Sequence, residues 1–321
     1  MQAPQPPENE QQRVHKVHAM NILDTAAEER FDRLTRLTRH LFEVPGSLIS
    51  LVDEHRQWIK SSQGIAIQEI PRDVSFSAHA ILQQGCFLVE NASLDERFSD
   101  NPLVIGEPNI LFYAAWPLKE PDGYTIGTLS LFDTKPRAFE QQDQALLEKL
   151  STFVESELAE VQYASLDELT GISNRQGFMQ LSALSVDMCK RRQRNLAVIV
   201  FDLDDFSMIN QQFGHQHGDE ALQVFAQHLQ RALPQADLVA RLENDQFVAL
   251  FTNTDDETIE RSLVEFQEHI SQHNHDSDRP YEIYYSAGHV CTQQLEQNSV
   301  EELIIQANAI MYEKKQQKLI I

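Results

Sequence analysis

Hydrophobic positions in the first part of the chain follow two different spacings. Over residues 21–39, apolar side chains recur at helical spacing, which predicts a helix with Asp24 or Thr25 as its cap. Short apolar or alternating runs between turn residues follow, and this pattern is typical of strands. The predicted strands cover residues 47–53, 55–62, 86–90, 113–118 and the segment after the tight turn at residues 122–123. Several antiparallel strands between helices predict an α+β domain that ends near residue 140.

A long helix is predicted next, over about residues 141–165. Apolar side chains recur every seven positions at Leu147, Val154 and Val161, with Leu150 and Leu158 between them. Two arrangements fit this spacing. The helix can pack onto the sheet of its own domain, or it can pair in parallel with the same helix of a second chain.

The remaining residues predict a second sheet. A turn at Gly171 leads into a helix that begins near Asn174, and the apolar run over residues 196–206 suits a buried central strand. An amphipathic helix, a hairpin, a further strand and a last helix follow at residues 217–233, 236–251, 281–290 and 300–315. This order predicts a sheet that is covered by helices.

The overall charge narrows the classes of partner. The formal net charge is −23 at pH 7, and the isoelectric point is near 4.8. Nucleic acids and anionic membranes would repel such a chain, so we expect neither as a partner. If the ligand is itself an anion, a local cluster of cations or a bound metal ion has to overcome this field.

Cysteine usage and hydropathy indicate the compartment. Cys86, Cys189 and Cys291 are widely spaced and form no CxxC pair, which argues against a disulfide framework or a zinc site and fits a reducing compartment. No window approaches the roughly 18 apolar residues of a membrane span. Residues 1–19 are polar and proline-rich and lack the apolar core of a signal peptide, so we expect a disordered tail and a cytoplasmic protein.

The first half of the chain resembles a GAF domain of the bacterial sensory type. The resemblance rests on residues 30–64, 75–81, 95–104, 112–118 and 123–133, and it covers most of residues 20–160. It implies a sensor domain that holds a small molecule, whose identity the sequence does not give. Where such domains often carry cysteine, this chain has Ser77 and Ser130, which argues against thiol chemistry or a covalently attached chromophore.

The second half resembles a GGDEF domain, the domain of diguanylate cyclases. The segments DELTGISNRQGF, FDLDDFSMINQQFGHQHGDEAL and RLENDQF carry the resemblance, at residues 167–178, 201–222 and 241–247. It implies a sheet like that of the adenylyl cyclase and polymerase palm, and an activity that joins two GTP molecules into cyclic di-GMP. The residues at the signature positions are Glu243, Asn244, Asp245, Gln246 and Phe247.

The resemblance assigns metal ligands to three residues. Asp202, the Leu203 carbonyl and Asp245 match the family's metal-binding positions. Carboxylate and backbone oxygens are ligands that Mg²⁺ prefers. We therefore expect Mg²⁺ as a cofactor only if a nucleotide is bound.

The resemblance also assigns nucleotide-binding residues. Asn210 and Asp219 match the pair that hydrogen-bonds the guanine edge, and His215 lies in the same loop. An amide and a carboxylate suit the acceptor and donors of guanine. Lys315 matches the lysine that reaches the terminal phosphates from the last helix.

Several site positions depart from the family pattern. Glu243 and Asn244 replace two glycines, Gln246 replaces a carboxylate, and Ser207 replaces a lysine. Loss of one preorganised electrostatic group typically lowers the rate by about 10²–10³. Several such losses predict little turnover, so no catalytic residue is assigned with confidence to the ENDQF segment.

Two arginines of the family pattern are missing, one that binds phosphate and one that belongs to an inhibitory site. Leu319 stands where one is expected, and the adjacent Lys318 points about 100° away on a helix. Residues 234–237 keep Asp237 but lack the arginine of an RxxD inhibitory site. Feedback binding of cyclic di-GMP is therefore not expected there.

Together these observations predict three segments: a disordered tail (1–19), a GAF sensor domain with its linker helix (20–160) and a degenerate GGDEF domain (161–321). We expect a homodimeric signalling protein of the cyclic di-GMP network that binds GTP or acts through a protein partner. One alternative is a slow diguanylate cyclase that uses Asp202 and Asp245 with two magnesium ions. Another is a scaffold that binds no nucleotide.

Overall fold

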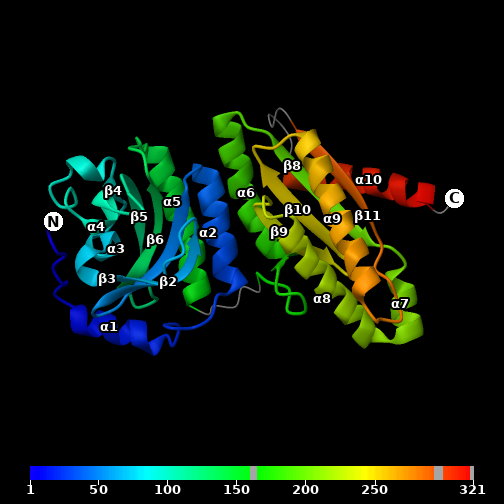
Figure 1. Cartoon of the computed structure of the whole chain (residues 1–321), viewed down its shortest axis with the longest axis horizontal. Coiled ribbons are helices and arrows are strands. Elements are labelled where there is room, and N and C mark those ends of the chain that lie inside the picture. The colour runs from blue at the N-terminus through cyan, green and yellow to red at the C-terminus, as the bar shows by residue number, and fades with distance from the viewer. Residues whose placement is uncertain (160–164, 293–298, 319–321) are drawn as a thin grey trace. The chain divides into compact units, whose positions relative to one another are not determined.

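The computed structural model describes residues 1–159, 165–292 and 299–318. It divides the chain into two compact units, Met1–Tyr163 and Ala164–Ile321, which are described separately (Figure 1). Each unit combines one sheet with covering helices. This architecture confirms the predicted two-domain α+β class.

The first unit is built on an antiparallel sheet of strand order β3-β2-β1-β6-β5-β4. The strands are β1 (Gly46–Val52), β2 (Arg56–Gln63), β3 (Glu69–Pro71), β4 (Phe87–Val89), β5 (Phe112–Lys119) and β6 (Thr125–Asp133). The α-helices are α1 (Glu10–Ala19), α2 (Glu29–Phe42), α3 (Phe76–Ala80), α4 (Pro102–Ile105) and α5 (Gln141–Leu158). Helices α2 and α5 pack side by side on one face of the sheet, and α3 covers the other (Figure 1).

Helix α2 begins later than its spacing predicted. Asn21 and Asp24 both have positive φ angles, of 52° and 59°, which interrupt a right-handed helix. The helix starts at Glu29, and Glu28, not Asp24 or Thr25, is its N-cap residue.

Helix α5 packs onto the sheet of its own unit. Leu147, Leu150 and Val154 have no exposed area, and Leu158 is also buried, where α5 contacts α2, β5 and β6. This packing accounts for the spacing of these four residues. Val161 lies outside the described residues, and pairing of this segment between two chains stays a prediction.

The first 19 residues differ from the predicted disordered tail. Helix α1 packs against β1 and β6, and its Val17 and Arg13 are buried. The Arg13 guanidinium donates to the Val52 carbonyl and, at 2.8 and 2.9 Å, to the Glu10 carboxylate. Burial alone would raise the pKa of Glu10, but hydrogen bonds from Arg13 and Arg72 outweigh it and lower the pKa to about 2. These partners are distant in the chain, so local composition did not reveal them.

The second unit is built on a sheet of order β11-β8-β10-β9-β7, in which only the β7–β9 pair is parallel among the described strands. The strands are β7 (Ser173–Asn174), β8 (Leu196–Leu203), β9 (Leu238–Glu243), β10 (Gln246–Thr252) and β11 (Tyr285–Thr292). The helices are α6 (Arg175–Arg192), α7 (Phe206–Phe213), α8 (His215–Ala232), α9 (Asp256–Asp276) and α10 (Val300–Lys318). Helices α8 and α9 contact each other, and α6 and α10 form a second contacting pair (Figure 1).

The end of β8 is fixed by aromatic packing. Every residue of β8 is buried. Phe201 packs against Phe225, Phe266 and Tyr285 at ring-centroid distances of 6.1, 5.4 and 5.9 Å. Since strand side chains alternate between faces, this anchor turns the next residue, Asp202, to the opposite face.

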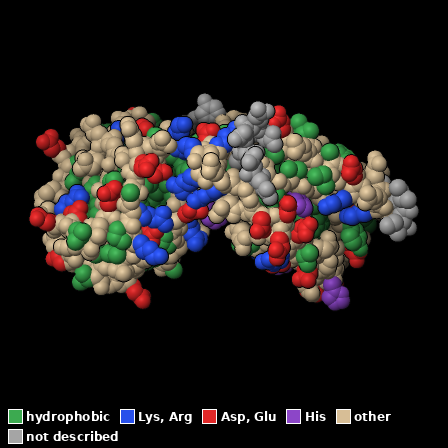
Figure 2. All heavy atoms as spheres, turned by 90° about the horizontal axis from the view of Figure 1, so that it is seen from above, with side chains coloured by type: hydrophobic (Ala, Val, Ile, Leu, Met, Phe, Trp, Pro, Cys, Tyr) green, Lys and Arg blue, Asp and Glu red, His purple; other side chains and the backbone are tan. Residues whose placement is uncertain are grey.

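The acidic character of the chain is spread over its surface. Figure 2 shows Asp and Glu side chains on the visible face of both units, with hydrophobic side chains scattered between them. Such a distribution keeps the charges solvated, as expected for an acidic surface coat.

We expect Arg13→Met to destabilise the first unit by roughly 3 kcal/mol, because the Val52 carbonyl and Glu10 lose a buried charged partner. Lys16→Met is the matched control, since Lys16 lies on the same helix but pairs with Asp122 at the surface. Urea unfolding of both variants measures the difference. Equal midpoints for the two variants would show that α1 does not stabilise the unit through Arg13.

Candidate functional site

Three neighbouring strands bring polar residues together at one end of the second sheet. Asp202 lies near the end of β8 and pairs in register with Gln246 of β10 and Ser286 of β11. The turn between β9 and β10 carries Asp245, whose carbonyl accepts a hydrogen bond from the Leu203 amide at 3.3 Å. The two predicted metal carboxylates therefore lie at the same end of the sheet.

Lys315 of α10 contacts this acidic group. Its ammonium donates to the Asp202 carboxylate and lies 3.5 Å from the Leu203 carbonyl oxygen and 3.6 Å from Oδ1 of Asp204. Burial raises the pKa of Asp245, and the nearby charge of Asp202 raises it further. The structure thus brings together Asp202, Leu203 and Asp245, the predicted metal ligands, and Lys315, a predicted nucleotide-binding residue.

Lys318 joins the same cluster, which the sequence did not predict. Its ammonium donates to Oδ2 of Asp204 at 3.0 Å and to the Tyr285 carbonyl at 2.6 Å. Ser286 donates to Oδ1 of Asp204 at 2.8 Å. The sequence did indicate that Lys318 lies near Lys315, because the two residues are three positions apart and so share one face of a helix.

Magnesium would find suitable ligand chemistry here, but not a suitable arrangement. Carboxylate and carbonyl oxygens are its preferred ligands. However, the Asp202 carboxylate and the Leu203 carbonyl already face the Lys315 ammonium. Within residues 1–159, 165–292 and 299–318, no group of three His, Cys, Asp or Glu side chains is placed to hold a metal ion. In this conformation, the Lys315 ammonium therefore contacts two of the three oxygen ligands that the sequence assigned to a metal ion.

The turn that carries the signature residues has a well-anchored backbone. Asn244 has a φ of 45°, in the left-handed region that asparagine tolerates better than most residues. Arg241 donates two hydrogen bonds, of 2.8 and 2.6 Å, to the Asn244 carbonyl. The same guanidinium contacts the Asp167 carboxylate at 3.1 and 3.2 Å. The turn is thus tied to the segment that precedes β7.

The side chains around this turn face different surroundings. Glu243 is exposed, and its carboxylate lies 3.9 Å from the Arg175 guanidinium. Gln246 is half-buried at the start of β10. Phe247 has no exposed area and packs on Phe225 with ring centroids 4.9 Å apart, so it is a core residue.

The predicted guanine-binding residues lie on α7 and α8. Gly214, with a φ of 90°, separates the two helices, and His215 is the first residue of α8. A Cβ atom at Gly218 would come within 2.1 Å of Oδ1 of Asn210. Asn210 is half-buried, whereas His215 and Asp219 are exposed. Gly218 therefore leaves room for the Asn210 amide against α8, the helix that also carries Asp219.

Asp237 faces the protein interior. It is buried, its carboxylate accepts a hydrogen bond from the Thr252 amide, and its own amide donates to the Leu250 carbonyl at 2.8 Å. The Asp237 carboxylate thus provides a hydrogen-bond acceptor for a backbone amide of β10, which is a structural role.

The first unit has a closed polar centre beneath α3. The Ser77 hydroxyl lies 2.9 Å from both the Tyr113 hydroxyl and Oγ1 of Thr128, and burial raises the pKa of Tyr113. The rings of Phe76 and Phe98 stack beside them, with their centroids 4.2 Å apart. Side chains of the unit itself therefore fill this part of the interior.

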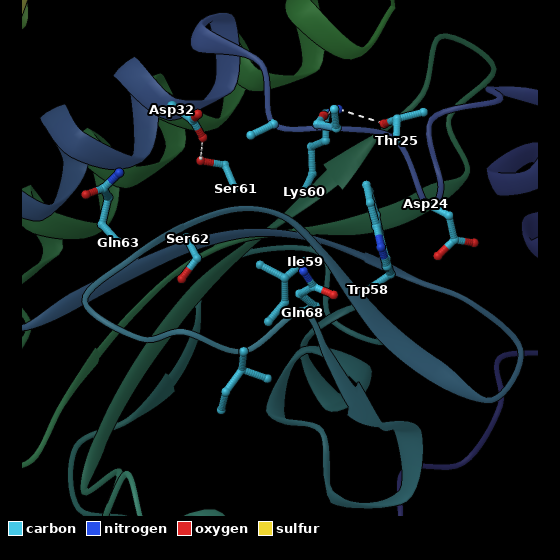
Figure 3. Close-up of a pocket in the computed structure, with 13 residues that line it drawn as sticks. Asp24, Thr25, Asp32, Trp58, Ile59, Lys60, Ser61, Ser62, Gln63 and Gln68 are labelled. Atoms are coloured by element: carbon cyan, nitrogen blue, oxygen red, sulfur yellow. Dashed lines mark hydrogen bonds between the residues drawn. The ribbon is translucent and has the colours of Figure 1, made fainter. Parts of the chain in front are cut away.

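An open cavity of about 470 Å³ lies between β2 and the segment before α2 (Figure 3). Its wall includes Trp58 and the hydroxyl groups of Ser61 and Ser62. The Lys60 ammonium donates to Thr25 Oγ1 and to the Ala26 carbonyl, both at 2.8 Å. The cavity is thus lined largely by polar groups, and its lysine is already engaged.

Family models match both units. A model described as the GAF domain matches residues 26–158, and one described as diguanylate cyclase, GGDEF domain, matches residues 164–319. The chain contains a GAF domain followed by a GGDEF domain. This finding confirms both resemblances, and it places the cavity in the GAF domain and the acidic cluster in the GGDEF domain.

Named relatives of this GAF–GGDEF chain include proteins with two different activities. A cyclic di-GMP phosphodiesterase of Pseudomonas aeruginosa is 36% identical over 214 residues, which cover 65% of this chain and 35% of that protein. The diguanylate cyclase DgcP of Escherichia coli is 23% identical over 287 residues, which cover 83% of this chain and 82% of that protein. The chain therefore spans about a third of the length of the phosphodiesterase.

The GGDEF domain also has similar solved structures. The GGDEF domain of DgcB from Caulobacter crescentus, in complex with c-di-GMP, is 22% identical with a TM-score of 0.45, and the match covers 49% of this chain and 92% of that one. In the described ranges, no helix has the length and apolar content needed to cross a bilayer.

We expect Gly218→Ala to destabilise the GGDEF domain by about 1–3 kcal/mol, because the added methyl group displaces the Asn210 amide. Gly85→Ala is the control, since a Cβ atom there meets nothing within 4 Å. Denaturant unfolding compares the two variants. Full stability of Gly218→Ala would mean that the Asn210 side chain is not held against α8.

Proposed function

We propose that this chain is a signalling protein of the cyclic di-GMP network. In this proposal, the GAF domain receives a signal, and the GGDEF domain binds a guanine nucleotide without joining two of them. The domain order and the activities of the named relatives support the network. The observation that supports nucleotide binding is the space at Gly218, which lets the Asn210 amide lie against α8, the helix on which Asp219 is exposed.

The chemistry of this pair suits guanine. The base presents an acceptor at O6 and donors at N1 and N2, and an amide and a carboxylate complement them. Asp219 is accessible, and the Asn210 amide lies against Gly218. Preorganised groups of this kind lose little entropy when they bind a ligand.

Turnover needs more than nucleotide binding. Joining two GTP molecules depends on positioning and on stabilisation of negative charge, with little covalent work for the protein. Glu243 adds a negative charge beside the turn, Gln246 supplies no charge, and Ser207 stands in place of a lysine. We therefore propose that the GGDEF domain signals through its nucleotide-bound state or through a protein partner.

The GAF cavity is the candidate binding site for the signal molecule. Its volume of about 470 Å³ lies in the range of small-molecule sites. The side-chain amides of Gln63 and Gln68 offer both donors and acceptors, whereas the hydroxyl groups of Ser61 and Ser62 already donate to Asp32 and to the Ile65 carbonyl. A small polar molecule is the class of ligand that these groups favour.

We expect GTP binding by isothermal titration calorimetry, with an affinity that Asp219→Ala lowers at least about tenfold by removing a charged hydrogen-bond partner. Glu265→Ala is the control, because Glu265 is an exposed carboxylate on α9. No binding of GTP at millimolar concentration by the unmodified chain would reject the proposal. Such a result, together with co-purification of a protein partner, would favour the scaffold.

A slow diguanylate cyclase is the competing function, and it is favoured by the proximity of Asp202 to Asp245. We expect no cyclic di-GMP when the purified chain is incubated with GTP and Mg²⁺ and the products are identified by mass spectrometry. Product that disappears in Asp202→Ala would establish the cyclase instead. Product that persists in this variant would come from a contaminant.

A further inference from the structure

Two lysines of α10 reach the acidic end of the GGDEF sheet from one helix face. We infer that the ammonium groups of Lys315 and Lys318 are the resident cations of this site, so that the folded domain satisfies Asp202 and Asp204 without a divalent metal ion. The inference concerns cation selectivity alone. It stands apart from nucleotide binding, because its test uses a metal ion without nucleotide.

Lys315 takes the place that a metal ion would need. Its ammonium donates to Asp202, whose side chain is 9% exposed, and lies 3.5 Å from the carbonyl oxygen of Leu203. The ammonium group thus contacts both oxygen ligands that β8 would offer to a metal ion.

Lys318 donates a hydrogen bond to the neighbouring carboxylate, that of Asp204. It donates to Asp204 at 3.0 Å, to the Tyr285 carbonyl at 2.6 Å and to the Ser286 hydroxyl at 3.3 Å. Three acceptors are the full capacity of an ammonium group. Asp204 also receives the Ser286 hydroxyl at 2.8 Å, so this carboxylate has both a charged and a neutral partner.

The charges of the cluster nearly balance. Asp202, Asp204 and Asp245 contribute −3, and Lys315 and Lys318 contribute +2, which leaves −1. A divalent cation that entered would have to break the Lys315–Asp202 contact and would then repel a nearby ammonium group. Magnesium also demands near-octahedral geometry from its ligands, which a carboxylate held by lysine does not provide.

Removal of one ammonium group should therefore create a metal site. Lys315→Met keeps the length of the side chain but leaves Asp202 and Asp245 close together without this counter-charge. Mn²⁺ is the probe, because electron paramagnetic resonance measures the unbound ion directly. We expect Lys315→Met to bind Mn²⁺ at least about tenfold more tightly than the unmodified chain, since no charged hydrogen bond has to be broken.

The matched control is Lys314→Met, which removes the same charge from an exposed position on the same helix. It should leave Mn²⁺ binding at the level of the unmodified chain. Lys315→Met/Asp202→Asn should lose the new binding. This pair of controls separates the cluster from general attraction of Mn²⁺ to an acidic protein.

A second readout is thermal stability with and without Mn²⁺. We expect Mn²⁺ to raise the melting temperature of Lys315→Met and Lys315→Gln, but not that of the unmodified chain. The inference would be overturned if the unmodified chain bound Mn²⁺ saturably and Asp202→Asn abolished this binding. This test holds even if both Lys315 variants fail to fold. Equal Mn²⁺ affinities for Lys315→Met and Lys314→Met would overturn it as well.

Discussion

The ion pair between Lys315 and Asp202 determines what the acidic end of the GGDEF sheet can hold. Asp202 is buried at the end of the central strand, where an unpaired carboxylate would be costly. Burial and the charge of Asp202 both raise the pKa of Asp245 on the adjacent turn, so the two carboxylates repel each other. An ammonium group from α10 relieves this repulsion, and it ties the last helix to the middle of the sheet.

In the turn beside this ion pair, the backbone conformation and the charge of the side chains depend on different residues. Asn244 adopts the left-handed backbone conformation, and Arg241 donates two hydrogen bonds to its carbonyl. The turn is therefore formed although two residues other than glycine occupy it. Glu243 and Gln246 nevertheless change the charge that a triphosphate would meet. In the proposed function, guanine is bound by different residues, Asn210 and Asp219, and the Asn210 amide lies against Gly218 on α8. The changes at the turn do not involve these residues.

Local patterns predicted most of this architecture because they reflect local forces. The strand that carries Asp202 and the last helix lie where their apolar residues predicted. The structure also brings Asp202, Asp245 and Lys315 to one end of the sheet, but the roles that the family resemblance assigned to them stay predictions. Helix α1 was missed because its stability comes from Arg13 and from partners far along the chain. Helical spacing places Lys318 on the same face as Lys315, but it does not reveal the three acceptors of Lys318, which lie on β11 and directly after β8.

The most direct measurement is anomalous diffraction at the manganese edge from crystals of the unmodified chain soaked in Mn²⁺. We expect no anomalous peak between Asp202 and Asp245, and density for the Lys315 ammonium on the Asp202 carboxylate. A manganese peak bound by both carboxylates and the Leu203 carbonyl, with Lys315 turned away, would contradict a lysine-held site.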